Sequence, residues 1–216
     1  MEVQFAVSKI SKWASRESGD TLEMIERPQG GLSMVLVDGQ TSGRSAKAIS
    51  NIVARKAVQL LGEGVRDGAA ARAAHDYLFT FRGGKVSATL NILSVDTRTR
   101  TIVISRNNES PVLVHTAADG FYQLDEESKA VGVHRNTKPV ITEIPIEVGT
   151  IVVAYTDGLR HAGTLSGKGC NYDPYAALQG MVMAGQCDAA SICDRLLEGA
   201  MVMDDGRPRD DISVIA

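Results

Sequence analysis

Hydrophobic and polar positions alternate along much of this chain with the two-residue period of β-strands. Other segments are short apolar runs, and turn-forming residues such as Gly, Asp, Asn and Pro separate them, as is typical of connected strands. The predicted strands cover residues 3–10, 21–26, 32–37, 86–95, 101–105, 112–115, 121–124, 140–146, 151–155 and 212–215. The pattern therefore predicts a protein rich in β-structure.

Four other segments have the spacing of apolar residues that predicts amphipathic helices. Residues 42–61 are one example, in which Lys and Arg separate the apolar positions and glycines follow as a helix stop. The other helices are expected at about 68–81, 174–183 and 188–203. Because blocks of strands are interrupted by pairs of helices, the order favours an α+β fold with mainly antiparallel sheets over a doubly wound parallel sheet.

Composition indicates a folded protein and limits its partners. The 216 residues contain no Pro- or Ser-rich linker, so we expect a single domain spanning residues 1–216. With 44% hydrophobic and 23% charged residues, the chain can bury a sizeable core. The net charge of -3 gives no excess of positive charge that would attract nucleic acid or an anionic membrane surface.

The cellular location is indicated by the first residues, the length of the apolar stretches and the cysteines. The first five residues lack a basic flank, and no stretch approaches the roughly 18 apolar residues of a membrane span. The 3 cysteines are odd in number, which fits reduced thiols better than a disulfide framework. We therefore expect a cytoplasmic protein.

Aspartates stand at the ends of several predicted strands. Asp38 and Asp157 each follow a buried strand and precede a glycine, while Asp20 and the pair Asp210-Asp211 each precede a strand. Asp-Gly is also a strong hairpin signal. The residues after the first Asp-Gly lead into a predicted helix, however, and those after the second lead into an expected loop. Two interpretations stay open: sharp turns, or a site built from carboxylates.

A site of this kind would need a cation. If the sheets bring the strand ends together, the carboxylates repel one another, and a hard divalent ion such as Mg²⁺ or Mn²⁺ relieves that repulsion. Gly39 could turn its own carbonyl toward the ion as a further oxygen ligand. The pattern therefore predicts a metal site.

In order and separation, these residues resemble the SpoIIE-type branch of the metal-dependent protein phosphatase 2C (PP2C) family. The landmarks are Gly19-Asp20, Val37-Asp38-Gly39, Tyr155-Thr156-Asp157-Gly158 and Asp210-Asp211-Ile212-Ser213, which together extend over nearly the whole chain. The resemblance implies a four-layer αββα sandwich with two mainly antiparallel sheets flanked by helices. It also implies a protein-serine/threonine phosphatase that uses two Mn²⁺ or Mg²⁺ ions.

The resemblance further implies a role for each acidic residue. Asp38 would bridge two metals, Gly39 would offer its carbonyl, Asp157 and Asp210 would complete one metal, and Asp20 would serve the other. Asp38 and Asp157 are the expected catalytic positions, where a metal-bound hydroxide would attack phosphorus. Asp211 is the weaker choice of the terminal pair, and no substrate-binding residue is assigned.

The small size is most like that of RsbX, the stand-alone phosphatase of stressosome signalling. This implies a phosphorylated regulatory protein as substrate, such as a stressosome or STAS-domain protein. Two alternatives stay open, namely a partner-binding module without catalysis on the same fold and a small-molecule phosphatase. The presence of all four aspartates argues against the first, and a shallow site would argue against the second.

Three further features near these motifs have open roles. Arg16, four residues before Asp20, could contact a substrate phosphate or lie free on the surface. His161, four residues after Asp157, could lie near the metals. Residues 163–168 resemble a nucleotide-binding loop only superficially, and we expect them to form a flap beside the site.

Overall fold

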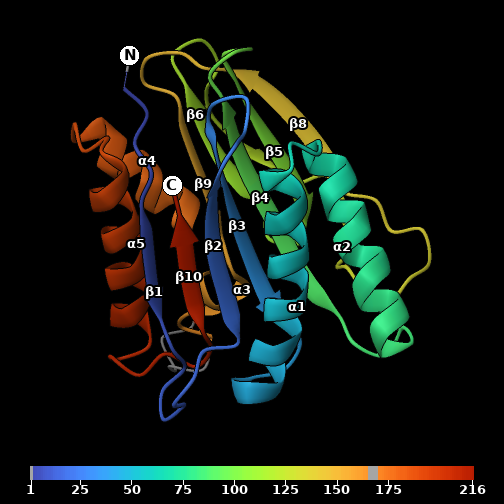
Figure 1. Cartoon of the computed structure of the whole chain (residues 1–216). Coiled ribbons are helices and arrows are strands. Elements are labelled where there is room, and N and C mark those ends of the chain that lie inside the picture. The colour runs from blue at the N-terminus through green and yellow to red at the C-terminus, as the bar shows by residue number, and fades with distance from the viewer. Residues whose placement is uncertain (1, 165–169) are drawn as a thin grey trace. The chain divides into compact units, whose positions relative to one another are not determined.

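The structure is a computed structural model that describes residues 2–164 and 170–216. The chain forms two compact units, one of residues 1–18, 110–125 and 147–216 (unit 1) and one of residues 19–109 and 126–146 (unit 2). Each unit contains one five-stranded sheet, and all strand pairs are antiparallel. Figure 1 labels the elements. The prediction of a single domain stays a prediction.

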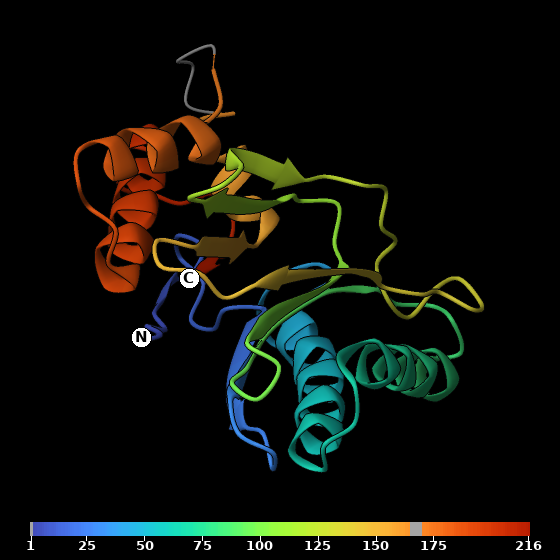
Figure 2. The same ribbon diagram turned by 90° about the horizontal axis from the view of Figure 1, so that it is seen from above.

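In unit 2 a sheet is covered on one face by two helices, which lie side by side in Figures 1 and 2. The helices are α1 (Gly43–Gly62) and α2 (Asp67–Arg82). The strands, in spatial order, are β2 (Asp20–Glu26), β3 (Leu32–Gly39), β4 (Ala88–Asp96), β5 (Thr101–Asn107) and β8 (Val140–Pro145). Val35 and Val37 pack with Ile49 and Val53 of α1 in the hydrophobic core. Because strand residues alternate between faces, residues 34, 36 and 38 lie on the face opposite the helices.

In unit 1 the second sheet packs against its own helices. Its strands, in order, are β1 (Val7–Ile10), β10 (Ile212–Ile215), β9 (Ile151–Tyr155), β6 (Val112–Thr116) and β7 (Gly120–Leu124), and its helices are α3 (Asp157–His161), α4 (Pro174–Met183) and α5 (Ala189–Met203). Val153 and Val214 pack with Ile192 and Leu196 of α5 in the core of this unit. Asp173 and Asp188 cap α4 and α5 by accepting hydrogen bonds from backbone N–H groups.

The predicted α+β class, with two antiparallel sheets flanked by helices, is confirmed. The four predicted helices agree with α1, α2, α4 and α5 to within two residues at each end. The first strand is shorter than expected, because Val7 pairs with Ile215 at the end of β10 and residues 3–5 have no partner strand there. Residues 165–168 of the expected flap lie outside the described residues.

The prediction of a loop after Asp157 is wrong, since the chain forms the short helix α3 there. Five residues are too few to show a helical period, so the sequence pattern could not reveal it. Tertiary packing holds this turn, because Leu159 and Ala162 are buried in the core of unit 1. None of the helices in the described ranges is long and apolar enough to cross a membrane.

Residues 126–139 contain no helix or named strand and are held to unit 2 by hydrogen bonds. Val131 exchanges backbone hydrogen bonds of 2.8 and 3.0 Å with Ala88. The His75 Nδ1 accepts a hydrogen bond of 3.0 Å from the backbone N–H of Gly132. His75 is only 2% exposed, and burial lowers the pKa of its imidazole, opposed by the nearby Asp76 carboxylate. The neutral imidazole therefore holds this segment.

Replacing His75 tests this interpretation. The unfolded chain binds a proton near the ordinary pKa of 6.5, whereas the folded His75 resists it, so stability is expected to fall as the pH is lowered from about 7 to about 5. His75→Asn keeps an acceptor but removes the titration, and the slope of unfolding free energy against pH should flatten. Urea unfolding at several pH values measures this. The exposed His134, changed to Asn, is the control, and an unchanged slope in His75→Asn would contradict the assignment.

Candidate active site

Two of the predicted aspartates form a pair in unit 2. Asp20 begins β2 and Asp38 lies near the end of β3, and the two are direct partners in the antiparallel register. Direct partners share one face, with Cβ atoms about 4.5–5.5 Å apart, and like charges at such positions are destabilising. Asp20 is 0% exposed and Asp38 is half-buried. This placement concentrates negative charge where a divalent cation would be stabilised.

Helix α1 packs closely against the backbone of the strand ends that carry this pair. A Cβ on Gly39 would lie 2.1 Å from the carbonyl oxygen of Ala46, so only glycine permits this approach. From α1, Lys47 donates hydrogen bonds from Nζ to the Asp20 carbonyl (2.7 Å) and to Thr21 Oγ1 (2.9 Å). Lys47 therefore helps to position the backbone of Asp20, a role with no signal in the sequence beyond a helical position.

The hairpin interpretation of Asp38-Gly39 is wrong. No strand pairs back against β3 directly after Gly39. Instead the chain enters α1 through two left-handed residues, Thr41 (φ 79°) and Gly43 (φ 68°). The side-chain Oε1 of Gln40 accepts a hydrogen bond from the Ser87 N–H at 3.0 Å, and the backbone N–H of Gln40 donates to the Ser87 carbonyl at 3.0 Å. Gln40 thus fastens the end of β3 to the segment before β4.

The other predicted aspartates form a second pair, in unit 1. Asp157 is the first residue of α3, and Asp210 lies just before β10. The pKa of Asp210 is raised, first by burial and then by the negative charge of Asp157, opposed by the backbone N–H of Asp211. The two carboxylates therefore interact. A Cβ on Gly158 would lie 2.1 Å from the carbonyl oxygen of Asp211, so here too the glycine follows from a close backbone approach.

Asp211 occupies a different environment from Asp210. It is 5% exposed, and its carboxylate accepts a hydrogen bond of 2.9 Å from the Lys12 N–H. Its own N–H donates to Asp210 Oδ1 at 2.9 Å. Asp211 thus links the loop after β1 to the segment before β10, which leaves Asp210 as the better ligand candidate of the two.

Two further side chains contact Asp157 or the loops next to the pair in unit 1. The Nδ1 of His161 lies 3.9 Å from Asp157 Oδ2, and this imidazole is 58% exposed. The buried Asp204 accepts hydrogen bonds from the N–H groups of Gly163 (2.8 Å) and Arg209 (3.0 Å), joining the loop after α3 to the loop before β10. Asp204 has no signal in the sequence that marks it as part of a site, because an aspartate at the end of a helix is also typical of a C-terminal turn.

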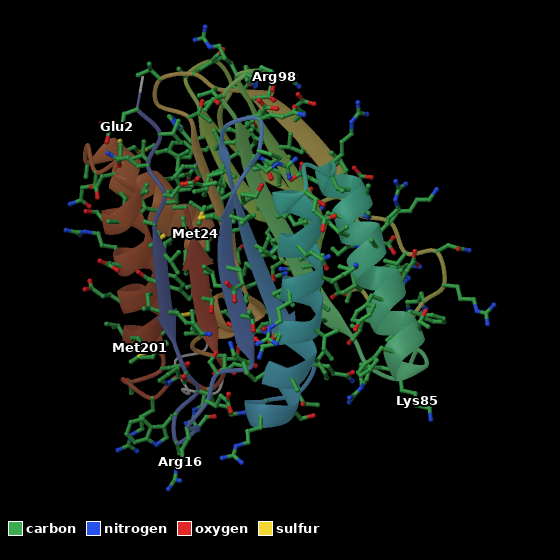
Figure 3. All side chains as sticks on the ribbon, in the orientation of Figure 1. Glu2, Arg16, Met24, Lys85, Arg98 and Met201 are labelled. Atoms are coloured by element: carbon green, nitrogen blue, oxygen red, sulfur yellow. The ribbon has the colours of Figure 1, made fainter. Side chains whose placement is uncertain are left out.

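The acidic candidates thus occur as two pairs. Within the described ranges, no group of three or more His, Cys, Asp or Glu side chains gathers by itself around a metal position. Oxygen donors of this type suit Mg²⁺ or Mn²⁺, and in each pair the side chains carry negative charge in a partly desolvated place. The residues present therefore fit a hard divalent cation. Arg16 is exposed at the outer end of the loop after β1, where Figure 3 labels it.

Known proteins resemble this chain in sequence or in fold. The family model described as Stage II sporulation protein E (SpoIIE) matches residues 28–216. No curated protein matches the sequence significantly.

Solved structures share the fold at low sequence identity. A PP2C phosphatase domain with a regulatory fragment of SpoIIE from Bacillus subtilis is 17% identical, with a TM-score of 0.82 over 100% of this chain and 62% of that one. This chain thus spans less than two thirds of that structure. RsbX in complex with magnesium is 15% identical, with a TM-score of 0.72 over 98% of this chain and 92% of its own. The catalytic domain of the phosphatase PstP with 2 manganese ions is 14% identical, with a TM-score of 0.70 over 98% and 96%.

These findings confirm the SpoIIE-type resemblance but not the narrower resemblance to RsbX. RsbX is one of several similar structures, and its TM-score of 0.72 is below the 0.82 of the SpoIIE domain. Both metals that the resemblance implied, magnesium and manganese, occur in these relatives. Since the family model matches most of the chain, this protein belongs to the SpoIIE family, and it shares its fold with PP2C-type phosphatase domains.

Proposed function

We propose that this chain hydrolyses phosphoserine and phosphothreonine on a protein, using two Mn²⁺ or Mg²⁺ ions held by Asp20, Asp38, Gly39, Asp157 and Asp210. The observation that carries the proposal is the direct pairing of Asp20 with Asp38 on one face of a sheet, in a chain of the SpoIIE family. Two carboxylates in direct register weaken a sheet, so their placement serves the site rather than the fold.

Three of the proposed ligands have a support that does not depend on the metal. Lys47 holds the backbone of Asp20, and the close approach of α1 orients the peptide of Gly39. The N–H of Asp211 donates to Asp210 Oδ1 and so restricts its rotation. Ligands fixed in this way bind a cation with less loss of side-chain entropy.

The two ions would supply Lewis-acid chemistry, lowering the pKa of water and stabilising the phosphate oxygens. Asp38 would hold both ions, Asp157 and Asp210 would hold one of them, and Asp20 the other. The exposed His161 imidazole lies next to the proposed ligand Asp157.

The substrate in this proposal is a phosphorylated bacterial regulatory protein of the stressosome or STAS-domain type, located in the cytoplasm. The support is the fold shared with RsbX, which spans nearly all of both chains. A protein substrate is also consistent with the exposed position of His161 and the half-exposed position of Asp157, with side chains 58% and 45% exposed.

The test is release of inorganic phosphate from a phosphoserine peptide and from a phosphorylated STAS-domain protein, with Mn²⁺, with Mg²⁺ and with a chelator. We expect turnover only with a divalent ion and loss of turnover in Asp157→Asn, whose fold should survive. The exposed Asp119, changed to Asn in a turn of the same unit, is the matched control. No turnover by the wild-type chain at saturating metal would favour the partner-binding alternative, and turnover limited to small phosphate esters would favour the small-molecule alternative.

A further inference from the structure

Helix α2 of unit 2 exposes two aromatic side chains next to each other. Tyr77 and Phe81 lie one turn apart, are 47% and 60% exposed, and stack with their ring centres 6.0 Å apart. The apolar residues that the same helix buries are smaller, namely Ala70, Ala71, Ala74 and Leu78. A helix that covers a sheet normally turns its large apolar side chains inward. The reversed arrangement here indicates that the outer face of α2 contacts something else.

The aromatic pair lies on the side of α2 that faces α1. The Nζ of Lys56 on α1 is 6.0 Å from the centre of the Tyr77 ring, in a cation–π arrangement. Figure 2 shows the two helices side by side with the sheet on one side of them, and in the described part of unit 2 no further element covers their outer side. A ligand bound there would contact both helices.

This helical layer is strongly basic. Residues 43–85, which include α1 and α2, contain eight Lys or Arg residues and three Asp or Glu residues, whereas the rest of the chain contains 15 and 23. Asp67 is one of the three anionic residues, and it is buried and paired with Arg27. The exposed cationic residues are Arg44, Arg55, Arg66, Arg72, Arg82 and Lys85, and the exposed anionic ones are Glu63 and Asp76. The positive charge is therefore concentrated on one layer of a chain whose net charge is -3.

Most of these exposed cationic side chains are not neutralised within the protein. Over the described ranges, no ion pair joins Arg55, Arg66, Arg72, Arg82 or Lys85 to a carboxylate. The neighbouring elements do not cancel the excess either, because unit 2 as a whole contains 15 cationic and 12 anionic residues, against 8 and 14 in unit 1. Like charges on one layer repel one another, and an anionic partner relieves that repulsion.

We infer that the outer face of α1 and α2 is a docking surface for an acidic segment of a partner protein that also carries apolar residues. The guanidinium and ammonium groups suit carboxylates, and Tyr77 and Phe81 cover the apolar residues, as aromatic anchors do in protein interfaces. A protein segment fits better than nucleic acid or an anionic membrane, because the negative charge of the whole chain repels such extended polyanions. The inference does not depend on the proposed function, since no residue of this surface is a proposed metal ligand.

Binding of a labelled peptide tests the inference without catalysis. A fluorescein-labelled peptide of Glu, Asp and Leu residues is titrated with the full chain in the absence of metal, and fluorescence anisotropy is recorded. We expect saturable binding with a Kd below about 0.1 mM that weakens as salt is raised. The same peptide with Lys in place of Glu and Asp should bind at least about tenfold more weakly.

Variants with matched controls locate the surface. Phe81→Ala should weaken binding roughly fivefold, while Trp13→Ala in unit 1, where the indole is 59% exposed, should leave it unchanged. The double variant Lys56→Gln, Arg72→Gln should also weaken binding roughly fivefold, and the exposed Arg195 of α5, changed to Gln, is its control. Circular dichroism checks that each variant is folded.

Several outcomes would overturn the inference. The absence of saturable binding to the acidic peptide is one, and equal affinity for the Lys peptide is another. Wild-type affinity in both Phe81→Ala and the double variant would place the peptide elsewhere on the protein. Tighter binding of a dT oligonucleotide, or of vesicles that contain phosphatidylserine, with loss of that binding in the same variants, would assign the surface to nucleic acid or to a membrane instead.

Discussion

Asp38→Asn is expected to lower kcat/KM for a phosphoserine peptide by roughly 10³-fold, equivalent to about 4 kcal/mol of transition-state stabilisation. Asparagine has nearly the same shape as aspartate but no charge, so it weakens the ligand that is proposed to hold both ions. In metal-free protein the same change should raise the melting temperature, because it removes one of two like charges in direct register with each other. The variant would thus lose activity while gaining stability.

Phosphate release and thermal unfolding with and without Mn²⁺ measure the two effects together. Glu23→Gln is the matched control, since Glu23 lies on β2 in the same sheet and is exposed. It removes one negative charge from the neighbouring strand of that sheet but should change neither quantity appreciably. An Asp38→Asn protein that keeps wild-type kcat/KM would exclude Asp38 as a metal ligand, and a variant that unfolds without metal would assign it a structural role instead.

Gly158→Ala is expected to lower the free energy of unfolding by about 3 kcal/mol, a fall in melting temperature of roughly 6–12 °C. The added Cβ would lie 2.1 Å from the Asp211 carbonyl oxygen and 3.0 Å from its carbonyl carbon, and backbone atoms cannot turn aside as a flexible side chain can. The segment that joins Asp157 to the core would have to move away from the segment of Asp210. Activity should therefore fall with stability.

Gly180→Ala provides the control, because it is the same substitution in the same unit. Gly180 lies within α4, and a Cβ there would meet no atom within 4 Å. Alanine loses less backbone entropy than glycine in a helix, so this variant should gain about 0.5–1 kcal/mol. Urea unfolding of both variants gives the comparison. Equal stability of Gly158→Ala and the wild type would show that the two backbone segments do not approach as closely as described.

Most elements of the fold were predictable, since their signals are local. Helix α4 and strand β10 have the predicted bounds, because apolar periodicity and the flanking turn residues act over neighbouring positions. Helix α3 was not predictable, because its five residues are helical only through the packing of Leu159 and Ala162. The start of β1 likewise depends on where its partner β10 ends.

The candidate site was likewise predictable in part. Asp20, Asp38, Asp157 and Asp210 were identified from their positions at strand ends, and the structure places them in two pairs. The supporting residues Lys47 and Asp204 carried no such signal, because their partners lie 27 and 41 residues away in the sequence.

The sequence by itself determined the α+β class, the family resemblance and the aspartates of the candidate site, since each depends on residue type and spacing along the chain. Only the tertiary structure decided why glycine follows Asp38 and Asp157. The glycines at 39 and 158 are dictated by contact with the backbones of Ala46 and Asp211, not by hairpin turns. The physical reason is that a steric limit between two backbones depends on how distant segments pack, which no local pattern records.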